Sequence, residues 1–140
     1  MMPKIDFYIL SENASQLPLA CQLVEKAYQQ NHKIYIQTEN LVLAEELDQL
    51  LWTYRDNSFL PHSLVQKKLE PRPPIQIGFG PISEDHSDIL INLSHDVPNF
   101  YHKFSRILEV VSSHPDHQTR ARERFRFYRT EACEINTHKL

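Results

Sequence analysis

The stretch IDFYILSENASQLPLACQLVEKAYQQNHKIYIQT, residues 5–38, begins and ends with short segments rich in Ile, Tyr and Phe. These segments, residues 5–10 and 33–38, are bounded by polar residues, which predicts two β-strands. Between them, apolar residues recur at the spacing of one helix face: Ala20, Leu23, Val24, Ala27 and Tyr28. The stretch therefore predicts a strand–helix–strand unit.

The alternation of strand and helix continues along the chain. Asn40 is suited to cap a second helix that runs through about Tyr54, with Ala44, Leu47 and Leu51 on one apolar stripe. After this helix the pattern becomes irregular. The next segment contains four prolines, which predicts a long surface excursion over residues 56–74.

Two further strands are expected at residues 74–80 and 88–94. The second is almost continuously apolar, which is typical of a central strand buried on both faces. Asp96 and Pro98 then predict the start of a third helix. Its expected apolar face consists of Phe100, Phe104, Ile107 and Val111.

The last part of the chain predicts one more helix and one more strand. Ser113, Pro115 and Asp116 are typical of a helix start, and residues 134–137 predict an edge strand. The whole pattern predicts an α/β fold, a three-layer sandwich with a central, largely parallel sheet of about five or more strands flanked by about four helices. We expect this Rossmann-like arrangement to form one domain over residues 1–140.

The sequence lacks the motifs that nucleotide binding, metal binding and nucleophilic catalysis require. Gly78 and Gly80 are the only glycines, so no glycine-rich turn is present to approach a nucleotide phosphate. The closest spacing for a metal site is in HPDH, residues 114–117, but a metal needs three or four convergent donors. No serine or cysteine lies in a recognisable nucleophile motif. We therefore expect no catalytic site, no cofactor and no metal.

Cysteine usage and the amino terminus bear on location. Cys21 and Cys133 are far apart in sequence, which fits a reducing compartment better than a disulfide-stapled secreted scaffold. The apolar run at the start of the chain is too short for a signal sequence or a membrane span. We expect a cytoplasmic protein without membrane contact.

The stretch RARERFRFYR, residues 120–129, holds five of the fifteen basic residues of a chain whose net charge is −3. On a helix, Arg122, Arg126 and Arg129 share one face, with Phe125 at its edge and Gln118 one turn earlier. Phe127 and Tyr128 are expected to face the core. A solvated charged face remains an open alternative.

The charge of the remaining chain helps to choose a partner for this face. Residues 1–119 carry nine basic and fifteen acidic residues, which would repel a nucleic acid at a distance. Arginine forks pair carboxylates as well as phosphates. A short acidic peptide with an apolar end therefore fits the mixed face better than duplex DNA.

A second unusual patch lies in LDQLLWTYRDNSFLPHSL, residues 47–64, which contains the only tryptophan. Trp52 and Phe59 either close over the core or, if they are exposed together, form an aromatic anchor of the kind enriched at protein interfaces. The residues alone leave both alternatives open.

Taken together, four segments of the chain resemble the chi subunit of the bacterial DNA polymerase III holoenzyme, in family order and at similar spacing. They are FYIL (residues 7–10), LDQLLW with SFLPH (47–52 and 58–62), DILINLS (88–94) and ARERFRFYR (121–129). The resemblance implies a non-catalytic adaptor of the clamp-loader assembly. Such a protein binds the psi subunit on one side and the acidic, phenylalanine-ended tail of single-stranded DNA-binding protein on another.

The resemblance also implies two sets of site residues. The tail-binding set is Gln118, Arg122, Phe125, Arg126 and Arg129. Gln118 stands where the family often has a basic residue and Phe125 where a tyrosine is common. The set for psi, or for a related repair helicase, is Trp52, Phe59, Leu60 and Pro61. A direct nucleic-acid-binding protein and a hydrolase or nucleotide-dependent enzyme are the alternatives to the adaptor.

Overall fold

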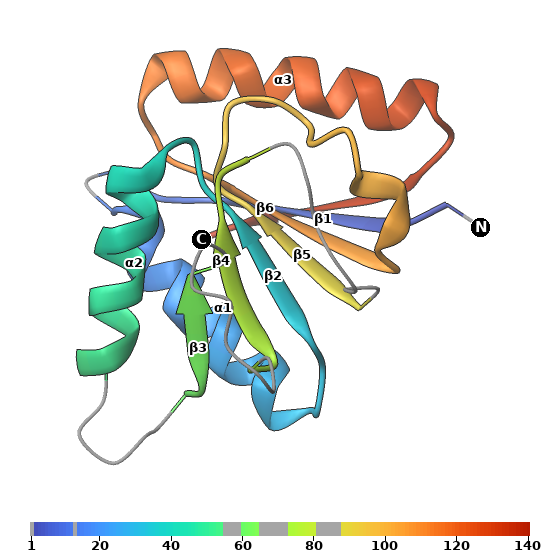
Figure 1. Cartoon of the computed structure of the whole chain (residues 1–140). Helices are drawn as coiled ribbons and strands as arrows, with labels where there is room; N and C mark the ends of the chain where they lie inside the picture. Colours follow the sequence, from blue (N-terminus) through green and yellow to red (C-terminus); the bar gives the residue numbers. More distant parts are fainter. Residues whose placement is uncertain (1, 13, 55–59, 65–72, 81–87) are drawn as a thin grey trace.

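Parallel strands form the centre of the molecule in a computed structural model of residues 1–140, which describes all residues except 1, 13, 55–59, 65–72 and 81–87 (Figure 1). The described residues form one seven-stranded sheet in the order β3-β4-β2-β5-β6-β1-β7. Every neighbouring pair is parallel. The strands are β1 Lys4–Ile9, β2 Ile34–Gln37, β3 His62–Leu64, β4 Ile75–Gly78, β5 Ile89–Asn92, β6 Arg106–Val111 and β7 Glu134–Lys139.

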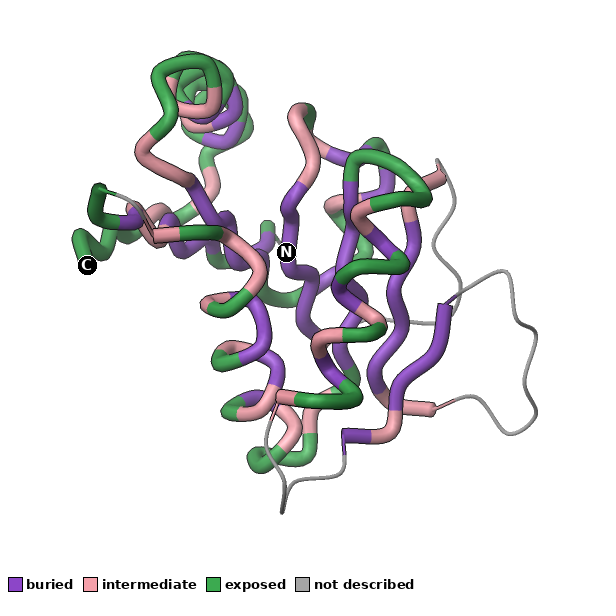
Figure 2. The backbone as a smooth tube through the Cα atoms, turned by 90° about the vertical axis from the view of Figure 1, so that its left-hand side faces the viewer, coloured by how far each residue is buried: buried purple, intermediate pink, exposed green. Residues whose placement is uncertain are grey.

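Helices cover both faces of the sheet, which confirms the three-layer architecture. The described helices are α1 Gln16–Gln29, α2 Leu41–Thr53, α3 Pro115–Thr130 and a short 3₁₀ helix, η1, Tyr101–Lys103. One core lies beneath α1 and α2, and a second lies beneath α3 and η1. Figure 2 shows the buried strands in the middle and exposed outer sides on the helices.

Neighbouring side chains of one strand enter different cores. In β6, Ile107 and Val111 belong to the core beneath α3, whereas Leu108 and Val110 belong to the core beneath α1 and α2. This division follows from the two-residue period of a strand. Strand β5 lies in the middle of the sheet between β2 and β6, and all four of its residues are buried. The predicted central strand at residues 88–94 is therefore confirmed.

The helix expected after Asp96 is wrong. Residues 101–103 form the single turn η1, and residues 106–111 form β6. The helical spacing arose because β6 is buried on both faces, so apolar residues occur at nearly every position and fit either period. The described part of the chain accordingly has three α-helices rather than about four.

The expected excursion at residues 56–74 is also wrong in part, because β3 lies within it. Its three residues are buried, and they pair with β4 at one edge of the sheet. The only other parts of this segment within the described residues are Leu60, Pro61, Pro73 and Pro74. The predicted edge strand at the end of the chain is confirmed, since β7 pairs with β1 at the opposite edge.

Two helix starts follow the local sequence. The Leu43 backbone N–H donates to Oδ1 of Asn40 at 3.0 Å, which caps α2 as predicted. At α3, the backbone N–H of Asp116 donates to His114 Nδ1 at 3.2 Å, and Pro115 occupies the first turn. The sequence therefore determines where α3, the helix that carries the arginine stretch, begins.

Candidate functional site

A buried ion pair fixes the rotation of α3 about its axis. Glu109 of β6 is fully buried, and Arg124 Nε donates to its Oε1 at 2.9 Å. The hydroxyl of Tyr128 donates to Oε2 of the same carboxylate at 2.6 Å. Burial and the neighbouring carboxylate raise the pKa of Tyr128 well above its usual value, so the hydroxyl keeps its proton. Arg124 and Tyr128 thus point toward the sheet, and the other arginines are turned outward.

This buried role of Arg124 was not expected from the sequence. The signal that could have revealed it is Glu109, the one carboxylate in the otherwise apolar run ILEVV, residues 107–111. A carboxylate on a strand that is buried on both faces requires a partner. Arg124 provides that partner, and its Nη1 also donates to the His95 carbonyl oxygen at 2.8 Å.

Phe127 and Tyr128, both expected in the core, separate in the structure. Tyr128 is fully buried, but the Phe127 side chain is 38% exposed, so its predicted core position is wrong. The physical reason is the rotation of α3, because the side that faces the sheet is centred on Ala121, Arg124 and Tyr128. Phe127 instead packs edge-on against Tyr101, with ring centroids 5.3 Å apart.

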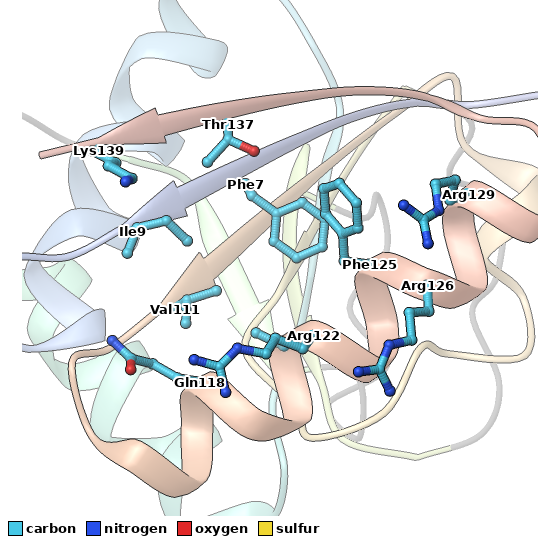
Figure 3. A pocket seen from close by; sticks show the side chains of 11 residues that line it. Phe7, Ile9, Val111, Gln118, Arg122, Phe125, Arg126, Arg129, Thr137 and Lys139 are labelled. Atoms are coloured by element: carbon cyan, nitrogen blue, oxygen red, sulfur yellow. The ribbon is translucent and has the colours of Figure 1, made fainter.

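A groove of about 600 Å³ lies between α3 and the β7 edge of the sheet (Figure 3). Strands β1 and β6 form its apolar floor with Phe7, Ile9 and Val111. The wall on α3 consists of Gln118, Ala121, Arg122, Phe125, Arg126 and Arg129. All five residues of the predicted tail-binding set therefore line one continuous surface.

The opposite wall of the groove comes from the last strand. Thr137 and Lys139 of β7 lie along it, across from the helix (Figure 3). The sequence interpretation missed these two residues and the three floor residues. The strand order brings them together beside α3, because β1 pairs with β6 on one side and with β7 on the other. The sequence of residues 134–137 predicted an edge strand but not its neighbour.

The groove is cationic. Arg122, Arg126, Arg129 and Lys139 are exposed, and no Asp or Glu is among the residues that line it. Within the part of the chain that the structure describes, none of these four side chains has an ion-pair partner. An anion can therefore pair with these cations without first displacing a carboxylate of the described residues.

Aromatic side chains connect the cations to the apolar floor. The guanidinium carbon of Arg129 lies 5.9 Å from the ring centroid of Phe125, within the range of a cation–π contact. The rings of Phe125 and Phe7 have centroids 5.5 Å apart. Guanidinium groups above an apolar floor suit a ligand with carboxylates and an apolar side chain. An acidic peptide with an apolar end has this chemistry.

Arg120 lies outside the groove, as the helical period predicts. It borders a separate depression on the other side of α3, together with Glu123 and Phe127. Arg120 and Arg122 are therefore two exposed arginines of one helix that face different surfaces.

The second predicted set is only partly brought together. Trp52, near the end of α2, is 53% exposed, and its ring centroid lies 4.7 Å from that of His62. Pro61 is half-buried, whereas Leu60 is 3% exposed and belongs to the core beneath α1 and α2. Phe59 lies outside the described residues. Trp52 and Pro61 are thus the members with described exposed surface.

Neither a metal site nor a membrane-spanning helix is found among the described residues. Among the described residues, no three His, Cys, Asp or Glu side chains gather in an arrangement that could hold a metal ion. In the same residues, no helix has the length and apolar character required to cross a membrane. Burial raises the pKa of the Cys21 thiol to about 12, which makes it unreactive at neutral pH.

Comparison with known proteins identifies the family. Residues 2–136 match the family model described as DNA polymerase III chi subunit, HolC. A Pseudomonas aeruginosa protein named DNA polymerase III subunit chi is 36% identical over 99% of this chain and 98% of its own length. Proteins of the same name from Haemophilus influenzae and Escherichia coli are 32% and 26% identical, over at least 97% of both chains. The chain therefore belongs to the chi subunit family of DNA polymerase III, a family of replication proteins.

Proposed function

We propose that this protein is a non-catalytic adaptor of the DNA polymerase III clamp-loader assembly in the cytoplasm. In this role it binds the psi subunit with one surface and the acidic carboxyl-terminal tail of single-stranded DNA-binding protein with another. It thereby connects the polymerase to coated single-stranded template during DNA replication.

The observation that carries the proposal is the composition of the groove. Arg122, Arg126 and Arg129 stand above an apolar floor without a competing carboxylate among the residues that line the groove. A tail with several carboxylates and a terminal phenylalanine supplies complementary charge and an apolar side chain that the floor can bury. Hydrogen bonds to charged groups stabilise such a contact by about 1.5 to 3 kcal/mol each when water is excluded.

The position of Trp52 supports a separate surface for psi, or for a repair helicase that uses the same patch. Trp52 is on α2, which packs on the face of the sheet opposite α3. Two ligands can therefore bind at the same time, as an adaptor requires. An exposed tryptophan is typical of an interface anchor.

Calorimetric titration separates this proposal from its alternatives. The full chain is titrated in parallel with a synthetic acidic tail peptide that ends in phenylalanine, with ATP, and with a single-stranded oligonucleotide. We expect saturable one-to-one binding of the peptide and no heat of binding with the other two ligands.

The peptide signal should weaken as salt rises, because exposed charges are screened, but the apolar contact should preserve part of it. If the oligonucleotide binds and the peptide does not, the result would favour a direct nucleic-acid-binding protein. Binding of ATP would favour a nucleotide-dependent enzyme. Either result would contradict the adaptor.

A further inference from the structure

We infer that Lys139 of the last strand binds a carboxylate of the same acidic tail, so that the tail lies between two cationic walls rather than along one helix. This inference rests on the proposed function and extends it to a residue outside the predicted tail-binding set. Its basis is the position of Lys139 across the groove from the α3 arginines (Figure 3).

The alternation of β7 directs Lys139 into the groove. Thr137 and Lys139 line the groove, and in the parallel register they are the partners of the floor residues Phe7 and Ile9. His138, the residue between them, faces the other side of the sheet. There its Nε2 contacts Asp6 Oδ1 at 2.9 Å.

This contact on the far face fixes the register of the strand. The ring of His138 also stacks on Tyr8, with centroids 4.8 Å apart. A slip of one residue would exchange the two faces, moving Lys139 away from the groove and breaking the His138–Asp6 contact. The register that buries the floor therefore also sets the direction of Lys139.

The backbone around Lys139 is held on both sides of the residue. The whole of β7 pairs with β1, from Lys4 opposite Glu134 to Ile9 opposite Lys139. Beyond the strand, the backbone N–H of Leu140 donates to the Ile9 carbonyl oxygen at 3.0 Å. Lys139 is thus attached to a fixed strand, and less backbone freedom is lost when its side chain pairs with a ligand.

The position along the groove gives Lys139 a distinct role. Figure 3 shows Lys139 and Gln118 at one end of the groove and Arg129 at the other. At its own end Lys139 faces a neutral amide across the groove, so it adds positive charge at the end that lies farthest from Arg129. A peptide whose carboxylates extend toward this end meets a cation on the strand.

The test compares two lysine variants with equal changes in net charge. Lys139→Gln removes the charge in the groove and keeps most of the side-chain length. Lys26→Gln removes the charge of an exposed lysine on α1, which covers the opposite face of the sheet. Each variant and the unaltered chain are titrated with a labelled peptide of three aspartates followed by an apolar segment and a terminal phenylalanine.

We expect Lys139→Gln to weaken peptide binding about two- to fivefold, the range of a partly exposed ion pair, and Lys26→Gln to leave it unchanged. A set of peptides in which asparagine replaces one aspartate at a time locates the contact. One of these peptides should bind the Lys139→Gln variant and the unaltered chain with equal affinity. The aspartate replaced in that peptide would identify the paired carboxylate.

Failure of the inference and failure of the proposed function give different results. If the unaltered chain binds the peptide and Arg122→Ala weakens binding, but Lys139→Gln behaves like Lys26→Gln, the second wall is wrong and the groove stands. The same conclusion follows if Lys139→Gln weakens binding of every asparagine-substituted peptide by the same factor. If the unaltered chain does not bind the peptide at all, both the proposed function and this inference fail.

Discussion

Glu109 is the residue on which the direction of the arginine face depends. Its carboxylate is fully buried and accepts hydrogen bonds from Arg124, Tyr128 and the side chain of Asn92. A buried ion pair contributes little compared with well-packed apolar residues, but removing one partner leaves a charge in the core. The arrangement therefore specifies how α3 is rotated more than it adds to net stability.

Arg124→Met should lower the free energy of unfolding by about 3 to 5 kcal/mol, because the Glu109 carboxylate then stays buried without its cation. The matched control is Arg120→Met, which changes an exposed arginine on the same helix and should alter stability by about 0.5 kcal/mol or less. Urea denaturation of both variants measures the difference. Equal midpoints for the two variants would contradict the role assigned to the pair.

Asp6 gives the stability a dependence on pH. Burial alone would raise the pKa of this carboxyl, but hydrogen bonds from His138 and Arg106 and their charges lower it below 3.8. A carboxyl whose pKa is lower in the folded state than in the unfolded state stabilises the protein at pH values above its unfolded-state pKa. This stabilisation is lost as the pH falls through the folded-state pKa. The contribution of Asp6 is therefore complete at neutral pH.

Asp6→Asn should reduce the free energy of unfolding at pH 7 by about 1 kcal/mol, since Arg106 and His138 lose a charged acceptor. The difference from the unaltered chain should shrink as the pH falls below 3.8, where the native carboxyl also becomes protonated. Urea denaturation at a series of pH values from 7 to 3 measures this difference. A difference that stays constant down to pH 3 would rule out the linkage.

At the scale of elements, most strands and helices were predicted, and the two misses were strands β3 and β6. Strands β1 and β2 are short segments rich in Ile, Tyr and Phe that are bounded by polar residues, and helix α1 has one apolar face. Strand β6 was interpreted as a helix because Ile107 and Val111 continue the helical spacing of Phe100 and Phe104, and burial on both faces leaves no polar alternation to indicate a strand. Strand β3 has only three residues and follows Pro61, so it was interpreted as part of the proline-rich excursion.

The candidate site was also predicted only in part from the sequence. Helical spacing alone placed Arg122, Phe125, Arg126 and Arg129 on one face, because these residues are local neighbours on α3. The floor and the Lys139 wall depend on which strands are adjacent, and strand order is a long-range property that no short pattern contains. Without knowledge of the strand order, the sequence therefore predicts only the α3 wall of the groove.

The end of α2 offers an interface prediction at this scale. Trp52→Ala should weaken binding of purified psi by about 2 kcal/mol or more, as expected for an interface anchor, and leave binding of the tail peptide unchanged. The control is Val42→Ala, which removes an apolar side chain that is 63% exposed at the other end of the same helix. Calorimetry with each partner measures both affinities. Unchanged psi binding by the Trp52→Ala variant would remove Trp52 from the interface.

For the whole molecule, the distribution of charge explains how an acidic chain can attract an acidic ligand. The net charge is −3, yet the groove combines three arginines and a lysine. Arg124 belongs to the same stretch but is neutralised inside the protein by Glu109, so it adds no charge to the groove. We therefore expect local pairing within the groove, rather than attraction at a distance, to determine binding of an acidic ligand.

The separation of the two surfaces completes this picture. The groove lies on the α3 side of the sheet, whereas Trp52 lies on α2 on the opposite side. Both surfaces are supported by the same rigid sheet. We therefore expect each partner to bind with the same affinity whether or not the other is present.

The most direct test of the central claim compares Arg122→Ala with Arg120→Ala in binding of the acidic tail peptide. Both substitutions remove an exposed arginine from α3, but only Arg122 lines the groove. We predict that Arg122→Ala weakens binding by about 1.5 kcal/mol, or roughly tenfold, and that Arg120→Ala changes it by about twofold or less. Equal losses in the two variants would show that the attraction is diffuse and would contradict a defined tail-binding groove.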